Sequence, residues 1–123
     1  MNTSQFFYRC VAFTRENGIV ALADIYNPSQ TSELEEWFGV VLSLADGVHT
    51  IKELIEYLSS RYASAPDNLE ETICSVIERL IEGNMIKLHD TKIDLPYYLA
   101  YPIEQLNIET AKQHMEKDGY VYH

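Results

Sequence analysis

Two stretches near the start of the chain are rich in aromatic and β-branched residues, as β-strands are. They run over Phe6–Arg15 and Ile19–Tyr26, and Glu16, Asn17 and Gly18 mark the boundary between them. An Asn-Gly pair suits the two central positions of a tight hairpin turn, because both positions need a positive φ. The pattern therefore predicts an antiparallel hairpin with its turn at Asn17-Gly18.

This turn fixes which residues face each other across the hairpin. One face is small and apolar and pairs Thr14 with Ala21, Ala12 with Ala23, and Cys10 with Ile25. The other face is bulkier and pairs Phe13 with Leu22, Val11 with Asp24, and Arg9 with Tyr26. Arg9 lies diagonal to Asp24 there, which predicts an ion pair. An isolated hairpin is marginally stable in water, so we expect helices or a third strand to cover it.

Apolar residues at helical spacing follow the hairpin. Thr31 or Ser32 is expected to cap the first helix, and Asp46-Gly47 is expected to end it. The predicted buried side of this helix consists of Leu34, Trp37, Phe38, Val41, Leu42 and Ala45.

Two further helices and a short strand complete a recognisable order of elements. Thr50 and Glu53 have the spacing of a capping box that opens the second helix, and Asp67 with Glu70 offers another to a third helix over about residues 68–82. Met85–His89 is predicted to be a strand, the wing. Two capped helices joined by a brief turn predict a winged helix-turn-helix. The expected fold is α+β: an antiparallel β-hairpin packed on three helices, with a C-terminal helical tail.

The third helix carries more apolar residues than one core-facing stripe needs. Leu69, Ile73, Val76 and Leu80 form the first stripe, and Cys74, Ile77 and Ile81 form a second beside it. One interpretation is a wide core face. The other is that Cys74, Ile77 and Ile81 line a groove open to a partner.

The last part of the chain has a different character and is treated as an extension over residues 90–123. Asp94–Pro102 is aromatic, bounded by prolines and predicted to be extended, whereas Asn107–Lys117 is predicted to be a helix that Gly119 ends. Tyrosine suits interfaces, because it joins an apolar ring to a polar tip. The extension is expected either to fold back over the bulky hairpin face or to dock on another protein or a second copy of the chain.

Charge narrows the classes of partner. The 123 residues carry a net charge of -10, with a pI near 4.7. The outward positions of the third helix are mostly acidic, so neither nucleic acid nor an anionic membrane surface is an expected partner. No apolar run approaches the roughly 20 residues that span a bilayer, and the N-terminus has no signal-peptide pattern. We expect a cytoplasmic protein.

Candidate chemistry is sparse. The four histidines have no second ligand at metal spacing, and the two cysteines, Cys10 and Cys74, lie far apart and are expected to be reduced. There is no Gly-rich phosphate loop and no serine in a nucleophile-elbow context. The sequence predicts no catalytic residues, no metal site and no cofactor, so we do not expect an enzyme.

One run of residues resembles a known family. Leu44–Leu54, LADGVHTIKEL, is similar to the L-x-D-G-x-x-T-hydrophobic-x-E-hydrophobic signature of PqqD-like proteins, and Tyr62, Pro66 and Gly83–Ile86 continue the likeness. These are RiPP recognition elements, small winged-helix domains that bind leader peptides of ribosomally made natural products. The resemblance covers about residues 6–89, and it makes residues 1–89 the expected peptide-binding domain.

The resemblance implies a mechanism. A leader peptide adds as a strand to the edge of the N-terminal sheet, in the cleft against the third helix, which is β-augmentation. The expected peptide-binding residues are Ile19, Ala21, Leu22, Ala23, Asp24, Ile25 and Tyr26 on the strand, and Cys74, Ile77 and Ile81 on the helix. The domain would then present the precursor to a separate maturase, often a radical-SAM enzyme that carries its own iron–sulfur cofactor. A second hypothesis is a structural or regulatory interaction module that forms a homodimer through its C-terminal tail.

Overall fold

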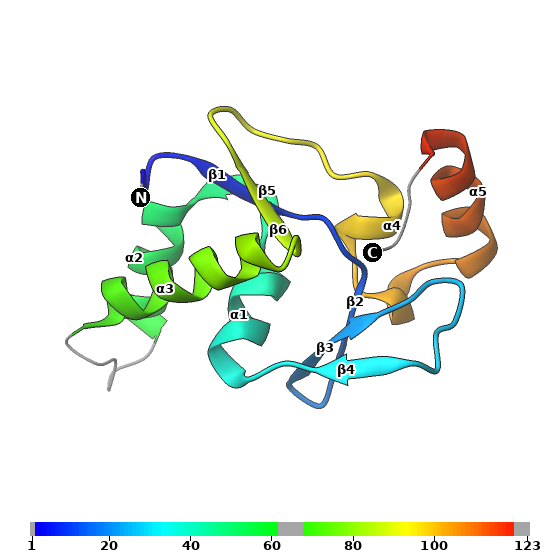
Figure 1. Ribbon diagram of the computed structural model, residues 1–123, viewed down its shortest axis with the longest axis horizontal. Helices are drawn as coiled ribbons and strands as arrows, with labels where there is room; N and C mark the ends of the chain where they lie inside the picture. The colour runs from blue at the N-terminus through cyan, green and yellow to red at the C-terminus, as the bar shows by residue number, and fades with distance from the viewer. Residues whose placement is uncertain (1, 62–67, 120–123) are drawn as a thin grey trace.

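The computed structural model describes residues 2–61 and 68–119. Over these residues the protein is α+β, with five α-helices, one 3-10 helix and two small antiparallel sheets. Figure 1 shows helices α1, α2 and α3 on one side of the strands and the C-terminal helices on the other. The expected α+β class is therefore confirmed.

The first sheet joins parts of the chain that are distant in sequence. Strand β1 (Phe6–Arg9) is central and pairs with β5 (Asp46–Thr50) on one side and β6 (Ile86–His89) on the other. The strand expected over Met85–His89 is thus present, and its partner is the start of the chain.

The second sheet is a local meander of β2 (Phe13–Glu16), β3 (Ile19–Ala23) and β4 (Thr31–Glu33). Asn17 and Gly18 have φ values of 53° and 78°, as the predicted hairpin turn requires. The predicted register is confirmed as well, since Thr14 pairs with Ala21.

The long first strand that the sequence predicted over Phe6–Arg15 is instead two strands in different sheets. The Cys10 N–H donates to the Met85 carbonyl at 2.8 Å, whereas the Ala12 carbonyl accepts from the Ala23 N–H at 3.1 Å. Because the hydrogen-bond partners change within three residues, the chain leaves the first sheet after Arg9 and enters the second at Phe13. Cys10 therefore pairs with Met85 rather than with Ile25.

The first helix begins later than predicted. Thr31–Glu33 is a strand rather than a helix cap, and α1 runs over Glu36–Leu44. The cause is the pairing with β3: the Leu34 N–H donates to the Val20 carbonyl at 3.1 Å, which keeps the backbone extended up to the helix. Asp46 already belongs to β5, so α1 also ends before the predicted Asp46-Gly47 stop.

Helices α2 (Ile51–Arg61) and α3 (Leu69–Glu82) match the prediction closely. The first capping box is formed in both directions: the Glu53 N–H donates to Thr50 Oγ1 at 3.2 Å, and the Thr50 N–H donates to Glu53 Oε1 at 2.9 Å. These bonds, with the Thr50 amide contributing most, lower the pKa of the Glu53 carboxyl. The capping box predicted at Asp67 lies outside the described residues.

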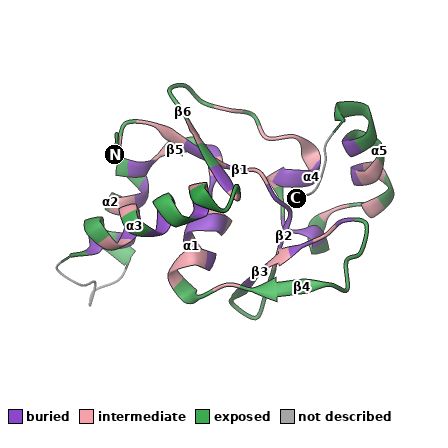
Figure 2. Ribbon diagram, viewed as in Figure 1, coloured by how far each residue is buried: buried purple, intermediate pink, exposed green. Residues whose placement is uncertain are grey.

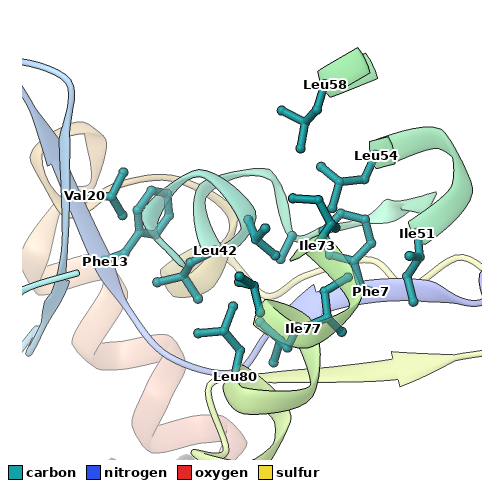
Figure 3. Packing of buried hydrophobic residues seen from close by; sticks show 14 of the residues in the cluster. Phe7, Phe13, Val20, Leu42, Ile51, Leu54, Leu58, Ile73, Ile77 and Leu80 are labelled. Atoms are coloured by element: carbon teal, nitrogen blue, oxygen red, sulfur yellow. The ribbon is translucent and has the colours of Figure 1, made fainter. Parts of the chain in front are cut away.

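The main hydrophobic core lies between the sheets and α1, α2 and α3. Figure 3 shows Phe7 and Phe13 from the strands packed with Leu42, Ile73, Ile77 and Leu80 from the helices. The close approach of α1 to β3 depends on Gly39, since a Cβ at that position would lie 2.9 Å from the Cβ of Val20. The bulky face of the hairpin is therefore covered by α1.

A second, smaller core holds the C-terminal extension. It contains α4 (Tyr97–Ala100), a 3-10 helix η1 (Ile103–Gln105) and α5 (Ile108–Asp118), so part of the segment predicted to be extended is helical. The helix expected near Asn107–Lys117 is confirmed, with Asn107 as its cap. Tyr98, Leu99, Ile103, Ala111 and Met115 pack with Ala12, Ala23 and Ile25.

The extension thus folds back over the small face of the hairpin rather than the bulky face that we expected. The bulky side chains of Phe13, Val20 and Leu22 already pack in the main core, whereas small residues leave room for helices on the opposite face. Figure 2 shows buried positions in α4 and α5.

Arg9 joins the two cores. Only 2% of this residue is exposed, and its guanidinium donates to four carbonyls: Leu42 and Ser43 at the end of α1, and Leu99 and Ala100 at the end of α4, at 3.0–3.1 Å. It also lies 4.5 Å from the centre of the Phe13 ring. The predicted ion pair with Asp24 is therefore wrong, because these acceptors occupy the guanidinium.

Candidate functional site

The outer edge of the second sheet is formed by β4, whose three residues are all exposed. Ser32 lies opposite Leu22 and Leu34 opposite Val20, and the Leu34 N–H bonds to Val20. Residues of an antiparallel strand alternate between bonded and non-bonded pairs. Thr31 and Glu33 therefore direct their backbone N–H and C=O groups away from β3. Strand β4 thus presents two donors and two acceptors at its outer side. Figure 2 shows β4 as exposed.

Strand β3, which the sequence made the expected docking edge, is internal. It pairs with β2 on one side and β4 on the other, so its backbone cannot take another strand. Of the predicted strand residues, Ala21, Ala23 and Ile25 are buried and Leu22 and Asp24 are half-buried. Ile19 and Tyr26 remain exposed, at the two ends. This correction moves the candidate edge from Ile19–Tyr26 to Thr31–Glu33.

The opposite edge of this sheet, along β2, is covered by the chain itself. The Arg15 N–H points away from β3 and donates to Glu104 Oε1 of η1 at 2.7 Å, and the Thr14 hydroxyl donates to Glu104 Oε2 at 2.6 Å. Partial burial, the largest single cause, raises the pKa of Glu104. These two hydrogen bonds, a bond from the Glu104 backbone and the charge of Arg15 together hold the pKa below its usual value. The carboxylate therefore takes the place that an added strand would need.

Two grooves border β4. One, of about 570 Å³, lies over the small face of the sheet and runs from Thr31 and Glu33 across Ala21 to Ile103 and Ile108 of the C-terminal extension. The other, of about 450 Å³, lies where the sheet meets α1, and its lining includes Val20, Glu33, Leu34, Glu36 and Val40. Side chains of an added strand alternate between the two faces of the sheet, so each groove would receive every second residue.

The second apolar stripe of α3 does not line these grooves. Ile77 is fully buried in the main core (Figure 3). Ile81 is half-buried and packed against that core. Cys74 is half-buried too. A further groove, of about 560 Å³, does lie between the start of α1 and α3, but its α3 wall consists of Glu71, Thr72, Ser75, Val76 and Arg79. The structure therefore does not bring Cys74, Ile77 and Ile81 together with the open edge.

A smaller cavity of about 310 Å³ lies between β5 and α2. Phe7, Leu44 and Leu54 form its apolar wall, and Asp46, His49, Glu53 and Tyr57 lie around it. His49 Nδ1 is 2.8 Å from Asp46 Oδ2, so the two residues form an exposed pair at the rim. Within the described ranges no group of three or more His, Cys, Asp or Glu residues could hold a metal ion.

The two cysteines are both thiols, and burial is the main cause that raises the pKa of each. A raised pKa leaves less thiolate at neutral pH, and the thiolate is the nucleophilic form.

Sequence reasoning missed two parts of this site. Thr31–Glu33 is too short to show the period-two pattern of a strand, and its hydroxyl residues suggested a helix cap. The one sign of a strand in the sequence was the β-branched Thr31 after a turn. Glu104 gave no signal, because its two partners lie 89 and 90 residues away in sequence.

Comparisons of this chain with protein-family models, with curated proteins and with solved structures found no match. No helix within residues 2–61 and 68–119 is long and apolar enough to cross a membrane.

Proposed function

We propose that this protein is a non-catalytic adaptor that binds the leader of a ribosomally synthesised precursor peptide by strand addition. It presents the bound precursor to a separate maturase, for which the resemblance to PqqD-like proteins suggests a radical-SAM enzyme. The observation that carries the proposal is the outer side of β4, where the backbone groups of Thr31 and Glu33 face away from the sheet. An extended peptide satisfies such groups by β-augmentation.

The order of elements supports a winged helix as the frame for this edge. Helix α1, strand β5, helices α2 and α3 and strand β6 follow one another in the order that such domains use. The capping box in the LADGVHTIKEL run is formed, and it fixes the start of α2. The part of the sequence that carries the resemblance therefore has a defined structural role.

Backbone pairing alone does not give useful affinity. Two donors and two acceptors on β4 allow at most four hydrogen bonds, each contributing about 1 kcal/mol net. Their sum roughly equals the lower estimate of the association cost, about 4 kcal/mol. Micromolar binding needs about -8 kcal/mol, so two or three peptide side chains must fill the grooves beside β4. The grooves therefore decide which peptide binds.

The proposal divides the chemistry between two proteins. This chain holds the peptide and needs no cofactor, while the maturase carries the iron–sulfur cluster and performs the modification. Both would work in the cytoplasm, where precursor peptides are made.

The test combines selection of ligands with residue-level hydrogen exchange. Linear random peptides displayed on phage are selected on the immobilised full chain, and the enriched peptides are synthesised and added to the ¹⁵N-labelled protein. Bound peptide is expected to slow exchange of the Thr31 and Glu33 amides. The Ser32 amide is the internal control, since it already faces Leu22 of β3.

Two outcomes decide the question. Slowed exchange at Thr31 and Glu33 with little change at Ser32 supports strand addition at β4. If selected peptides bind elsewhere and leave both amides exchanging as in the free protein, the proposed mode of binding is wrong.

A further inference from the structure

This inference rests on the proposed function and concerns the chemistry of the peptide. We propose that the strand received by β4 is cationic, with a lysine or arginine opposite Glu33 and further basic residues at alternate positions beside it.

The charged residues that line the two grooves are mostly acidic. Glu16, Glu33 and Glu104 line the groove over the small face, and Glu33 and Glu36 line the groove beside α1. Arg15 is the one cation that the described residues contribute to either lining. A peptide that follows β4 therefore passes through a negative field in both grooves, in a protein whose net charge is -10.

Geometry places one of these carboxylates directly beside an added strand. Glu33 is exposed and is one of the two β4 residues whose backbone groups face outward. An added strand puts a residue opposite Glu33 with the Cβ atoms about 5.5 Å apart, within reach of a lysine or arginine head group. The next residue on the same face lies opposite Thr31. Glu16 and Glu104 line the far side of the same groove, so they act on the peptide through the field of the groove and not as direct partners.

The sign of the charge decides between candidate peptides. An opposite-charge pair across two strands strengthens association by about 1.4- to 5-fold, and a like-charge pair weakens it by a similar factor. Only the lysine opposite Glu33 forms such a direct pair, so the peptide with three alternate lysines is expected to bind about two- to fivefold more tightly than the peptide with three glutamines. Because the carboxylates are exposed, salt at about 0.5 M is expected to remove most of this preference.

The experiment uses three synthetic nine-residue peptides that alternate valine with lysine, glutamine or glutamate. Each is titrated into the ¹⁵N-labelled full chain, with the Thr31 and Glu33 amides as reporters of the site. The order of affinity is expected to be lysine, then glutamine, then glutamate. In Glu33→Gln the advantage of the lysine peptide is expected to fall two- to fivefold. Glu56→Gln, an exposed glutamate of α2 that lines neither groove, is the matched control and is expected to leave it unchanged.

The outcomes separate this inference from the function on which it rests. If the glutamine or glutamate peptide protects Thr31 and Glu33 at the same affinity as the lysine peptide, the inference is overturned and strand addition stands. The inference is also overturned if Glu33→Gln and Glu56→Gln reduce the preference for the lysine peptide equally. That preference would then come from the net charge of the protein and not from Glu33. If none of the three peptides changes the two amides, both proposals fail.

Discussion

Arg9 is expected to hold the C-terminal extension to the rest of the protein, and Arg9→Met tests this. Methionine keeps much of the apolar volume and removes the guanidinium. Four hydrogen bonds at about 1 kcal/mol net each give about 4 kcal/mol. Burial, the largest cause, lowers the pKa of Arg9 to about 10, so desolvation of the charge offsets part of that gain. We therefore expect Arg9→Met to lower the free energy of unfolding by about 3 kcal/mol.

Urea denaturation followed by circular dichroism measures this loss. For a chain of this length it corresponds to a fall in Tm of about 10–15 °C. Hydrogen exchange adds a local test, because amides of α4 and α5 are expected to lose more protection than amides of α2. Arg15→Met is the control: Arg15 is exposed, and its substitution is expected to change stability by no more than about 0.5 kcal/mol.

The result that refutes the reasoning is an Arg9→Met protein within about 0.5 kcal/mol of the native stability. Water would then replace the guanidinium at the four carbonyls, and Arg9 would not be the link between the two cores. Arg9→Lys sharpens the test. An ammonium has three donors and no planar fork, so it is expected to recover less than half of the loss.

Three further predictions concern the core, the extension and the edges of the second sheet. Ile77→Asp is expected to abolish the cooperative unfolding transition in urea, because it places a carboxylate at a fully buried site; a folded Ile77→Asp protein would show that α3 can turn this face outward. Burial and the bond to Asp118 raise the pKa of Tyr98 from 10.0 to about 12, so the stability this residue contributes is complete below pH 10 and is lost as the pH rises towards about 12. The Tm values of the native protein and of Tyr98→Phe are expected to converge between pH 10 and about 12. A difference in Tm that stays constant over this pH range contradicts the raised pKa of Tyr98. Glu104→Ala is expected to uncover β2 and increase self-association in light scattering, with Glu109→Ala of the exposed side of α5 as its control.

The parts of the fold that sequence predicted correctly are those fixed by neighbouring residues. Asn17-Gly18 sets its own turn, and Thr50 with Glu53 sets the start of α2, because in each case the interacting groups lie within a few residues. Helical periodicity predicted α3 and α5 correctly, because the apolar residues that form each stripe also lie within a few residues of one another.

The parts that failed depend on distant partners. Thr31–Glu33 is a strand only because β3 lies beside it, and Arg9 finds acceptors 33, 34, 90 and 91 residues away. The extension covers the small face of the hairpin because α1 already covers the bulky face, which it approaches closely at Gly39. The candidate site lies on such elements, so local patterns could not place it.

The position of β1 has a consequence for how the chain folds. All three strands of the second sheet lie within Phe13–Glu33, so this sheet can assemble as soon as that segment leaves the ribosome. Strand β1 precedes the other described strands but must wait for β6 to complete the first sheet, and such long-range pairing is slow because a large loop has to close. Until then Phe7 has no finished core to enter, and the nascent chain exposes an aromatic strand that favours aggregation.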